Sequence, residues 1–115
     1  MSSYATSYTI LGYDFSEYRK KMLDMDWVWS DAGEPWVCGS REDHVQLFTD
    51  PMNGIDLYFG CVLSSKGEYD DTVTKISIEN LNEKKAIVDA ALQETGLQLP
   101  KEMPPYKLIS FLEWT

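Results

Sequence analysis

The feature that most limits the fold is an unbroken alternation of apolar residues in the middle of the chain. The alternating positions are Ile55, Leu57, Phe59, Cys61 and Leu63. Such alternation is typical of a strand with one buried face, because successive side chains of a strand point to opposite sides of a sheet. Residues 55–63 are therefore predicted to form a central strand whose odd-numbered side chains face the core.

Other segments predict further strands around this one. Residues 44–49 form a second β-rich run, and the Pro, Asn and Gly of residues 50–54 favour a hairpin turn between the two runs. Thr, Tyr, Ile and Phe, which favour strands, are frequent near both ends of the chain, at residues 4–13 and 106–114. Two weaker patterns predict a strand, a turn and a strand within residues 26–38 and a short strand at residues 73–78.

Two segments carry the signals of helices. The first begins at a capping pair, Asp14 and Glu17, and continues to about Met25 with apolar residues at helical spacing. The second is predicted from about Leu81 to Thr95, and it has an apolar stripe of Ile87, Val88, Ala91 and Leu92. Its proposed cap and stop residues are Asn80, Glu83 and Gly96, with Leu97 packing back on the helix end.

These elements predict one α+β domain spanning residues 1–115. Their order is β-α-β-β-(β)-α-β, in which two helices cover one face of a largely antiparallel sheet. The expected topology is an elaborated ferredoxin-like sandwich. The chain has 115 residues, of which 43% are hydrophobic, and a chain of this size can bury roughly two-thirds of its unfolded surface in one core.

The chain is strongly acidic. It has 19 acidic and 10 basic residues, for a formal net charge of -9. This charge argues against direct binding to nucleic acid phosphates or to an anionic membrane. We expect a cytoplasmic protein, because the sequence shows neither a basic segment followed by an apolar run at its start nor an apolar run of membrane-spanning length.

Motifs for catalysis and metal binding are scarce. The two cysteines, Cys38 and Cys61, and the single histidine, His44, lack the spacing of a zinc site. Both cysteines are expected to be buried thiols, and His44 a surface residue, rather than a nucleophile and base oriented by Asp43. Residues 50–56 fail the ligand register of a calcium loop, and nucleotide-binding and hydrolase motifs are missing. We assign no catalytic residue, cofactor or metal.

The densest acidic stretch runs from Asp24 to Asp43 and also holds three tryptophans. Carboxylates on a folded surface can imitate a nucleic acid backbone and occupy a basic groove, as small phage-encoded inhibitors of host enzymes do. The expected partner is thus a basic protein surface, such as that of a nucleic-acid-handling enzyme, with an exposed tryptophan as anchor. The predicted partner-binding residues are Asp24, Asp26, Trp27, Trp29, Asp31, Glu34, Trp36, Glu42 and Asp43.

Other interpretations of the same residues remain open. The acids can form a solvated face and the tryptophans can pack in the core. The chain can instead be an adaptor or assembly module that uses an apolar patch or an open sheet edge, including in a homodimer. A third alternative is a small-ligand or enzymatic domain with a pocket lined by Tyr8, Tyr58, Trp27 or Trp36.

Overall fold

A four-stranded antiparallel sheet forms the centre of the computed structural model, which describes residues 5–49, 56–67 and 69–114. The strands lie in the order β2-β3-β1-β4, and each neighbouring pair is antiparallel. Their bounds are Ala5–Asp14 for β1, Val45–Thr49 for β2, Leu57–Gly67 for β3 and Lys107–Trp114 for β4.

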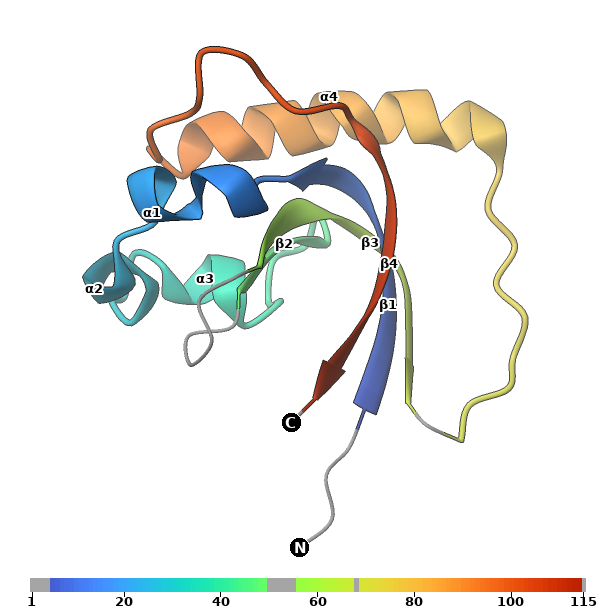
Figure 1. Cartoon of the computed structure of the whole chain (residues 1–115). Coiled ribbons are helices and arrows are strands. Elements are labelled where there is room, and N and C mark those ends of the chain that lie inside the picture. The colour runs from blue at the N-terminus through green and yellow to red at the C-terminus, as the bar shows by residue number, and fades with distance from the viewer. Residues whose placement is uncertain (1–4, 50–55, 68, 115) are drawn as a thin grey trace, which may run out of the picture.

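Short helices join β1 to β2, and one long helix joins β3 to β4. Figure 1 shows the long helix, α4, crossing one end of the sheet, with α1, α2 and α3 gathered toward one side. The helical segments are η1 (Ser16–Tyr18), α1 (Arg19–Met22), α2 (Met25–Val28), α3 (Glu34–Val37) and α4 (Ile78–Glu94).

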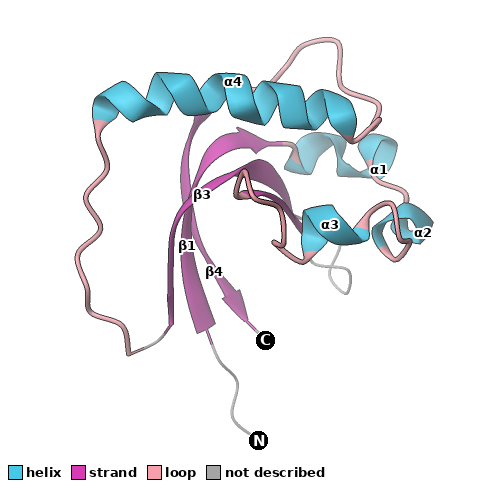
Figure 2. Ribbon diagram, turned by 180° about the vertical axis from the view of Figure 1, so that it is seen from behind, coloured by secondary structure: helices cyan, strands magenta, loops and turns pink. Residues whose placement is uncertain are grey.

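This topology confirms the predicted α+β class. Strands β1 and β2 and strands β3 and β4 are each separated by helices, and the two β-α-β units interleave in one antiparallel sheet. The order β2-β3-β1-β4 is the order of a ferredoxin-like sandwich. Figure 2 shows the helical layer against the sheet from behind.

The core lies between the helices and one face of the sheet, which we call the core face. Its β3 residues are Leu57, Phe59 and Cys61, all nearly inaccessible, so the predicted odd-numbered face of this strand is confirmed within the described residues. Ile55 lies outside them. The helices contribute Met22 from α1, Trp36 from α3, and Val88, Ala91 and Leu92 from α4.

The opposite face of the sheet carries an aromatic cluster drawn from all four strands. Phe48 of β2 lies 4.8 Å from Tyr8 of β1 and 5.0 Å from Phe111 of β4, measured between ring centroids. Tyr58 of β3 lies 4.8 Å from Phe111. Because β2 and β4 are the two edges of the sheet, rings from both edges meet only when the sheet curls strongly toward this face.

The first predicted helix is shorter in the structure, and it begins as the 3-10 turn η1, which runs directly into α1. Leu23 is extended, which ends α1 at Met22. At its start, Asp14 accepts a hydrogen bond from the Ser16 amide at 3.0 Å. The Phe15 amide donates to the Leu57 carbonyl at 2.8 Å. This link to β3 fixes the chain in a short turn, so η1 and α1 replace the single helix predicted from Asp14 to Met25.

The predicted strand, turn and strand at residues 26–38 is wrong. Here the chain forms α2 and α3, because Asp24 caps α2 by accepting from the Asp26 amide at 2.9 Å and Pro35 stands in the first turn of α3, where its missing amide hydrogen costs nothing. Val28 and Trp36 are buried by these turns. The alternation of Trp27 and Trp29 is too short to decide between strand and helix.

Two predictions near α4 also need correction. Residues 73–77 are exposed and outside any strand, although Thr74 Oγ1 lies 3.1 Å from Ser64 Oγ.

Helix α4 begins at Ile78 rather than Leu81, so Asn80 and Glu83 lie inside it and do not cap it. Ile87 is 41% exposed, whereas the other three residues of the predicted stripe are buried. Gly96 has a φ of 71° just after the helix, as the predicted glycine stop requires.

Candidate functional site

The candidate site is built on the turn that links α2 to α3. Ser30 closes this turn by donating from its hydroxyl to the Trp27 carbonyl at 2.6 Å, and the Gly33 amide donates to the Ser30 carbonyl at 3.2 Å. A Cβ at Gly33 would stand 2.1 Å from the Trp27 carbonyl oxygen. Only glycine therefore allows the two short helices to approach this closely.

One tryptophan and four acids of this segment face outward. Trp29 is 73% exposed, which is unusual for so large an apolar side chain. We call these five exposed residues the Trp29 surface: Asp24, Asp26, Trp29, Asp31 and Glu34. Five of the nine residues predicted to bind a partner are thus exposed within residues 24–34.

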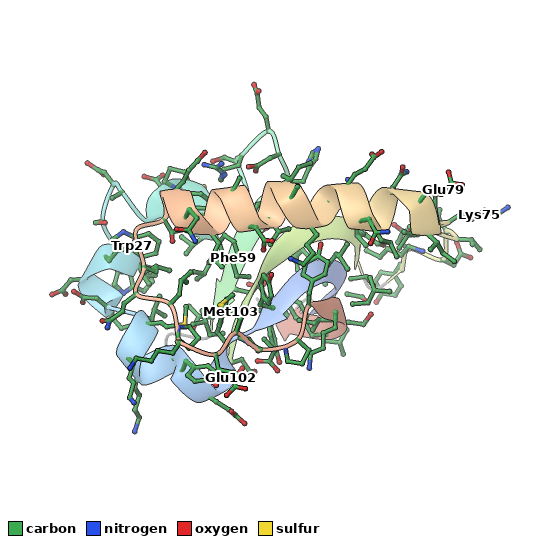
Figure 3. The ribbon with its side chains drawn as sticks, turned by 90° about the horizontal axis from the view of Figure 1, so that it is seen from above. Trp27, Phe59, Lys75, Glu79, Glu102 and Met103 are labelled. Atoms are coloured by element: carbon green, nitrogen blue, oxygen red, sulfur yellow. The ribbon has the colours of Figure 1, made fainter. Side chains whose placement is uncertain are left out.

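The other two predicted tryptophans point inward. Trp36 is only 5% exposed and its ring lies 5.9 Å from that of Phe59. Trp27 is half-buried against the core cluster, and Figure 3 shows it at the end of the molecule opposite Lys75 and Glu79, which mark the start of α4. These two residues pack α2 and α3 against the core, and Trp29 is the exposed one of the three.

Arg41 neutralises one of the predicted acids. Its guanidinium lies 3.8 Å from the ring centroid of Trp36 and 2.7 Å from the Asp43 carboxylate, and it also reaches Glu94 of α4 at 3.1 Å. Burial raises the pKa of Asp43, but hydrogen bonds from Arg41 and from the Val45 amide and the charge of Arg41 outweigh it and hold the pKa below its usual value. Asp43 is thus part of a structural ion pair, while Glu42 is exposed.

Sequence reasoning missed this contact. Several acids near Arg41 in the sequence could pair with it. The spacing between Arg41 and Trp36 does not indicate that the guanidinium stacks on the Trp36 ring. The stacking holds residues 41–43 against α3. In sequence, these residues follow the Trp29 surface.

The two cysteines differ in their surroundings. Cys61 is buried, as predicted, and burial raises the pKa of its thiol. Cys38 is exposed, so the prediction that it is buried is wrong; it follows the last residue of α3, and its thiol donates to Ser40 Oγ at 3.2 Å. His44 is exposed, as predicted.

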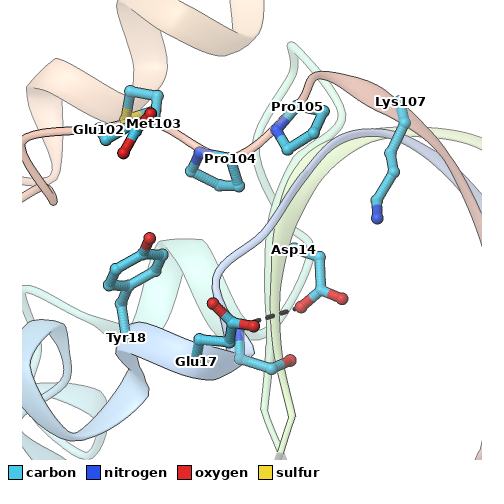
Figure 4. Close-up of a pocket in the computed structure, with 9 residues that line it drawn as sticks. Asp14, Glu17, Tyr18, Glu102, Met103, Pro104, Pro105 and Lys107 are labelled. Atoms are coloured by element: carbon cyan, nitrogen blue, oxygen red, sulfur yellow. Dashed lines mark hydrogen bonds between the residues drawn. The ribbon is translucent and has the colours of Figure 1, made fainter.

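A pocket of about 530 Å³ opens between η1 and the loop before β4 (Figure 4). The lining residues are Asp14, Ser16, Glu17, Tyr18, Glu102, Met103, Pro104, Pro105 and Lys107. None of the four aromatic residues predicted to line a ligand pocket is among them. Tyr8 and Tyr58 instead belong to the aromatic cluster, on the face of the sheet opposite Trp36.

In residues 5–49, 56–67 and 69–114, no three His, Cys, Asp or Glu side chains gather closely enough to hold a metal ion. Within the same ranges no helix has the length and hydropathy needed to cross a bilayer.

Comparison with known proteins adds no relative to this description. No family model, no curated protein and no solved structure matches the chain.

Proposed function

We propose that this protein binds a basic protein partner through the Trp29 surface, in a cytoplasmic setting. The observation that carries the proposal is the exposure of Trp29 among four exposed carboxylates. The site is concerned with binding rather than chemistry, and the partner class that fits it best is the nucleic-acid-binding groove of an enzyme, which the protein would inhibit by occupation.

The exposed indole supports this proposal through its energetics. Binding energy in protein interfaces is concentrated in a few residues, and tryptophan is among the most frequent of them. Trp29 ends α2 on a framework fixed by the burial of Val28 and Trp36. A rigid aromatic side chain costs little conformational entropy when a partner covers it.

The surrounding charges support the choice of a basic partner. Asp24, Asp26, Asp31 and Glu34 have no ion pair among the described residues, in which the ion pairs involve Arg41 and Lys85. Their charge is therefore available to a partner, although Lys20 and Lys21 on the preceding helix reduce it locally. Exposed charges of this kind set the association rate and the salt dependence more than the final affinity.

The test is affinity capture from a lysate of the organism that encodes the protein, with three baits at low and at high salt. The baits are the wild type, Trp29→Ala and the double variant Asp26→Lys/Asp31→Lys. We expect the wild type to retain a basic, nucleic-acid-binding protein at low salt, and added duplex DNA to compete with it. Each variant should retain much less.

The matched control is Asp71→Lys/Glu83→Lys, which changes the net charge by the same amount outside the Trp29 surface. Both residues are exposed. If this control and the site variants lose the partner equally, the effect is one of net charge and the proposed surface is wrong. Equal capture by all baits at both salt concentrations would also contradict the proposal.

A further inference from the structure

A second surface, distinct from the Trp29 surface, lies along the free edge of β4. Strand β4 pairs with β1 on one side, and no other strand of the described residues pairs with it on the other. It is eight residues long, and such an edge presents a row of unpaired backbone donors and acceptors. The other edge strand, β2, is shorter, with five residues, and α3 packs against it.

Two exposed side chains of β4 are apolar at positions where a protected edge would carry charge. Leu108 is 51% exposed and Leu112 is 58% exposed. They pair with Leu11 and Ser7 of β1, and Leu11 pairs in turn with the core residue Cys61 of β3. Both leucines therefore point to the core face of the sheet. Protected edges place lysine, proline or a bulge at such positions, so these two leucines indicate a surface that is covered in use.

The ends of β4 carry opposite charges without partners. Lys107 and Glu113 form no ion pair within the part of the chain that the structure describes. The residues that pair with them on β1 are Gly12 and Thr6, which carry no charge. Glu113 is half-buried, and this burial raises the pKa of its carboxyl, so the ionised form lacks compensation inside one chain.

We propose that β4 pairs antiparallel with β4 of a second copy, with the two-fold axis at Ser110. In this register each Lys107 lies opposite a Glu113, each Leu108 opposite a Leu112, and each Ile109 opposite a Phe111. Opposed residues of an antiparallel pair point to the same face with their Cβ atoms roughly 5 Å apart. The charges and the apolar side chains of β4 are therefore complementary to a second copy of itself.

The consequence is a continuous sheet across the two copies. The dimer closes the edge of β4, as an isologous contact does, and leaves no repeating edge from which a filament could grow at this strand. The contact uses no residue of the Trp29 surface. The dimer and the proposed function can therefore each be disproved without affecting the other.

The test uses sedimentation equilibrium on the wild type, on Lys107→Glu, on Glu113→Lys and on an equimolar mixture of these two variants. Wild type should associate reversibly from 13.2 kDa to twice that mass. Each single variant places like charges opposite one another at both ends of the interface and should self-associate roughly tenfold more weakly. The mixture restores both opposite-charge pairs and should dimerise as the wild type does.

Crosslinking checks the register separately. In a Cys38→Ser background, Ser110→Cys places two thiols opposite each other on the axis, where oxidation should join the two copies. Ser65→Cys on β3 is the exposed control and should remain monomeric. A wild type that sediments as a single 13.2 kDa species at every concentration overturns the proposal, and so does a mixture no better associated than its components.

Discussion

At the scale of the residue, the hydroxyl groups of two tyrosines beneath α4 differ in their hydrogen bonding. Tyr13 donates from its hydroxyl to Asp89 Oδ1 at 2.6 Å, and Lys85 donates to the other oxygen of Asp89 at 2.8 Å. The Tyr106 ring lies 5.3 Å from that of Tyr13, yet its buried hydroxyl has no hydrogen-bond partner among the described residues. One hydroxyl therefore stabilises the fold, and the other costs free energy.

We predict opposite effects of removing these two hydroxyls. Tyr106→Phe should raise the free energy of unfolding by about 1 kcal/mol, because a buried polar group without a partner is lost. Tyr13→Phe should lower it by about 1–2 kcal/mol, because a hydrogen bond to a carboxylate is lost. Urea denaturation of both variants and the wild type measures the two changes. Destabilisation by Tyr106→Phe would show that its hydroxyl is hydrogen-bonded in solution.

At the scale of the element, a pair of glycines permits the close approach of β1 and β3. Gly12 and Gly60 lie opposite each other in the register of the two strands. A Cβ at Gly12 would stand 2.1 Å from the Phe59 carbonyl oxygen, and a Cβ at Gly60 would stand 2.5 Å from that of Leu11. Glycine in a strand weakens it in general, so this pair reflects a close contact that the curled sheet requires.

The glycine pair gives a prediction with a control in the same sheet. Gly12→Ala should lower the free energy of unfolding by about 2–3 kcal/mol, because the new methyl group meets backbone atoms that cannot move aside. Gly67→Ala, at the end of β3, meets nothing within 4 Å and should change stability by less than about 0.5 kcal/mol. Thermal denaturation compares them, and equal stability of the two variants would contradict the close approach.

The elements that the sequence predicted correctly are those in which one pattern extends over many residues. The alternation along β3 and the apolar side of α4 survive in the structure, because burial of a whole face outweighs any single residue. The segment from Asp14 to Cys38 was predicted poorly, since its helices are only four residues long. Such helices are determined by caps and by tertiary contacts such as that of Phe15 with Leu57, which sequence periodicity does not record.

Part of the candidate site could also be predicted from the sequence. The acids and tryptophans of residues 24–43 could be located from composition alone. The division between exposed Trp29 and buried Trp36 could not, because it depends on the helical conformation of α2 and α3 and on Arg41, which lies against the Trp36 ring.

At the scale of the whole molecule, several groups that titrate in alkali are buried. Burial is the largest cause that raises the pKa of Cys61, Tyr13 and Tyr106, from ordinary values of 9.0 for the thiol and 10.0 for the phenols. The folded chain therefore holds these protons more tightly than the unfolded chain does. The corresponding stability is present below the ordinary pKa values and is lost as the pH rises through the folded ones.

We accordingly predict that the free energy of unfolding falls as the pH rises above about 9. Urea denaturation at a series of alkaline pH values measures the fall. Cys61→Ala should make the first part of the curve shallower, although it also creates a small cavity. A flat stability curve from pH ~8 to ~11 would contradict the burial of these groups.

At this scale we propose that the molecule presents an acidic, tryptophan-anchored surface to a basic partner. Stopped-flow association with the purified partner, measured against ionic strength, tests it most directly. We predict that the association rate of the wild type falls steeply with salt, that Asp26→Lys/Asp31→Lys lowers the rate and flattens this dependence, and that Trp29→Ala mainly speeds dissociation. Rates that are independent of salt, or unchanged in all three proteins, would contradict the claim.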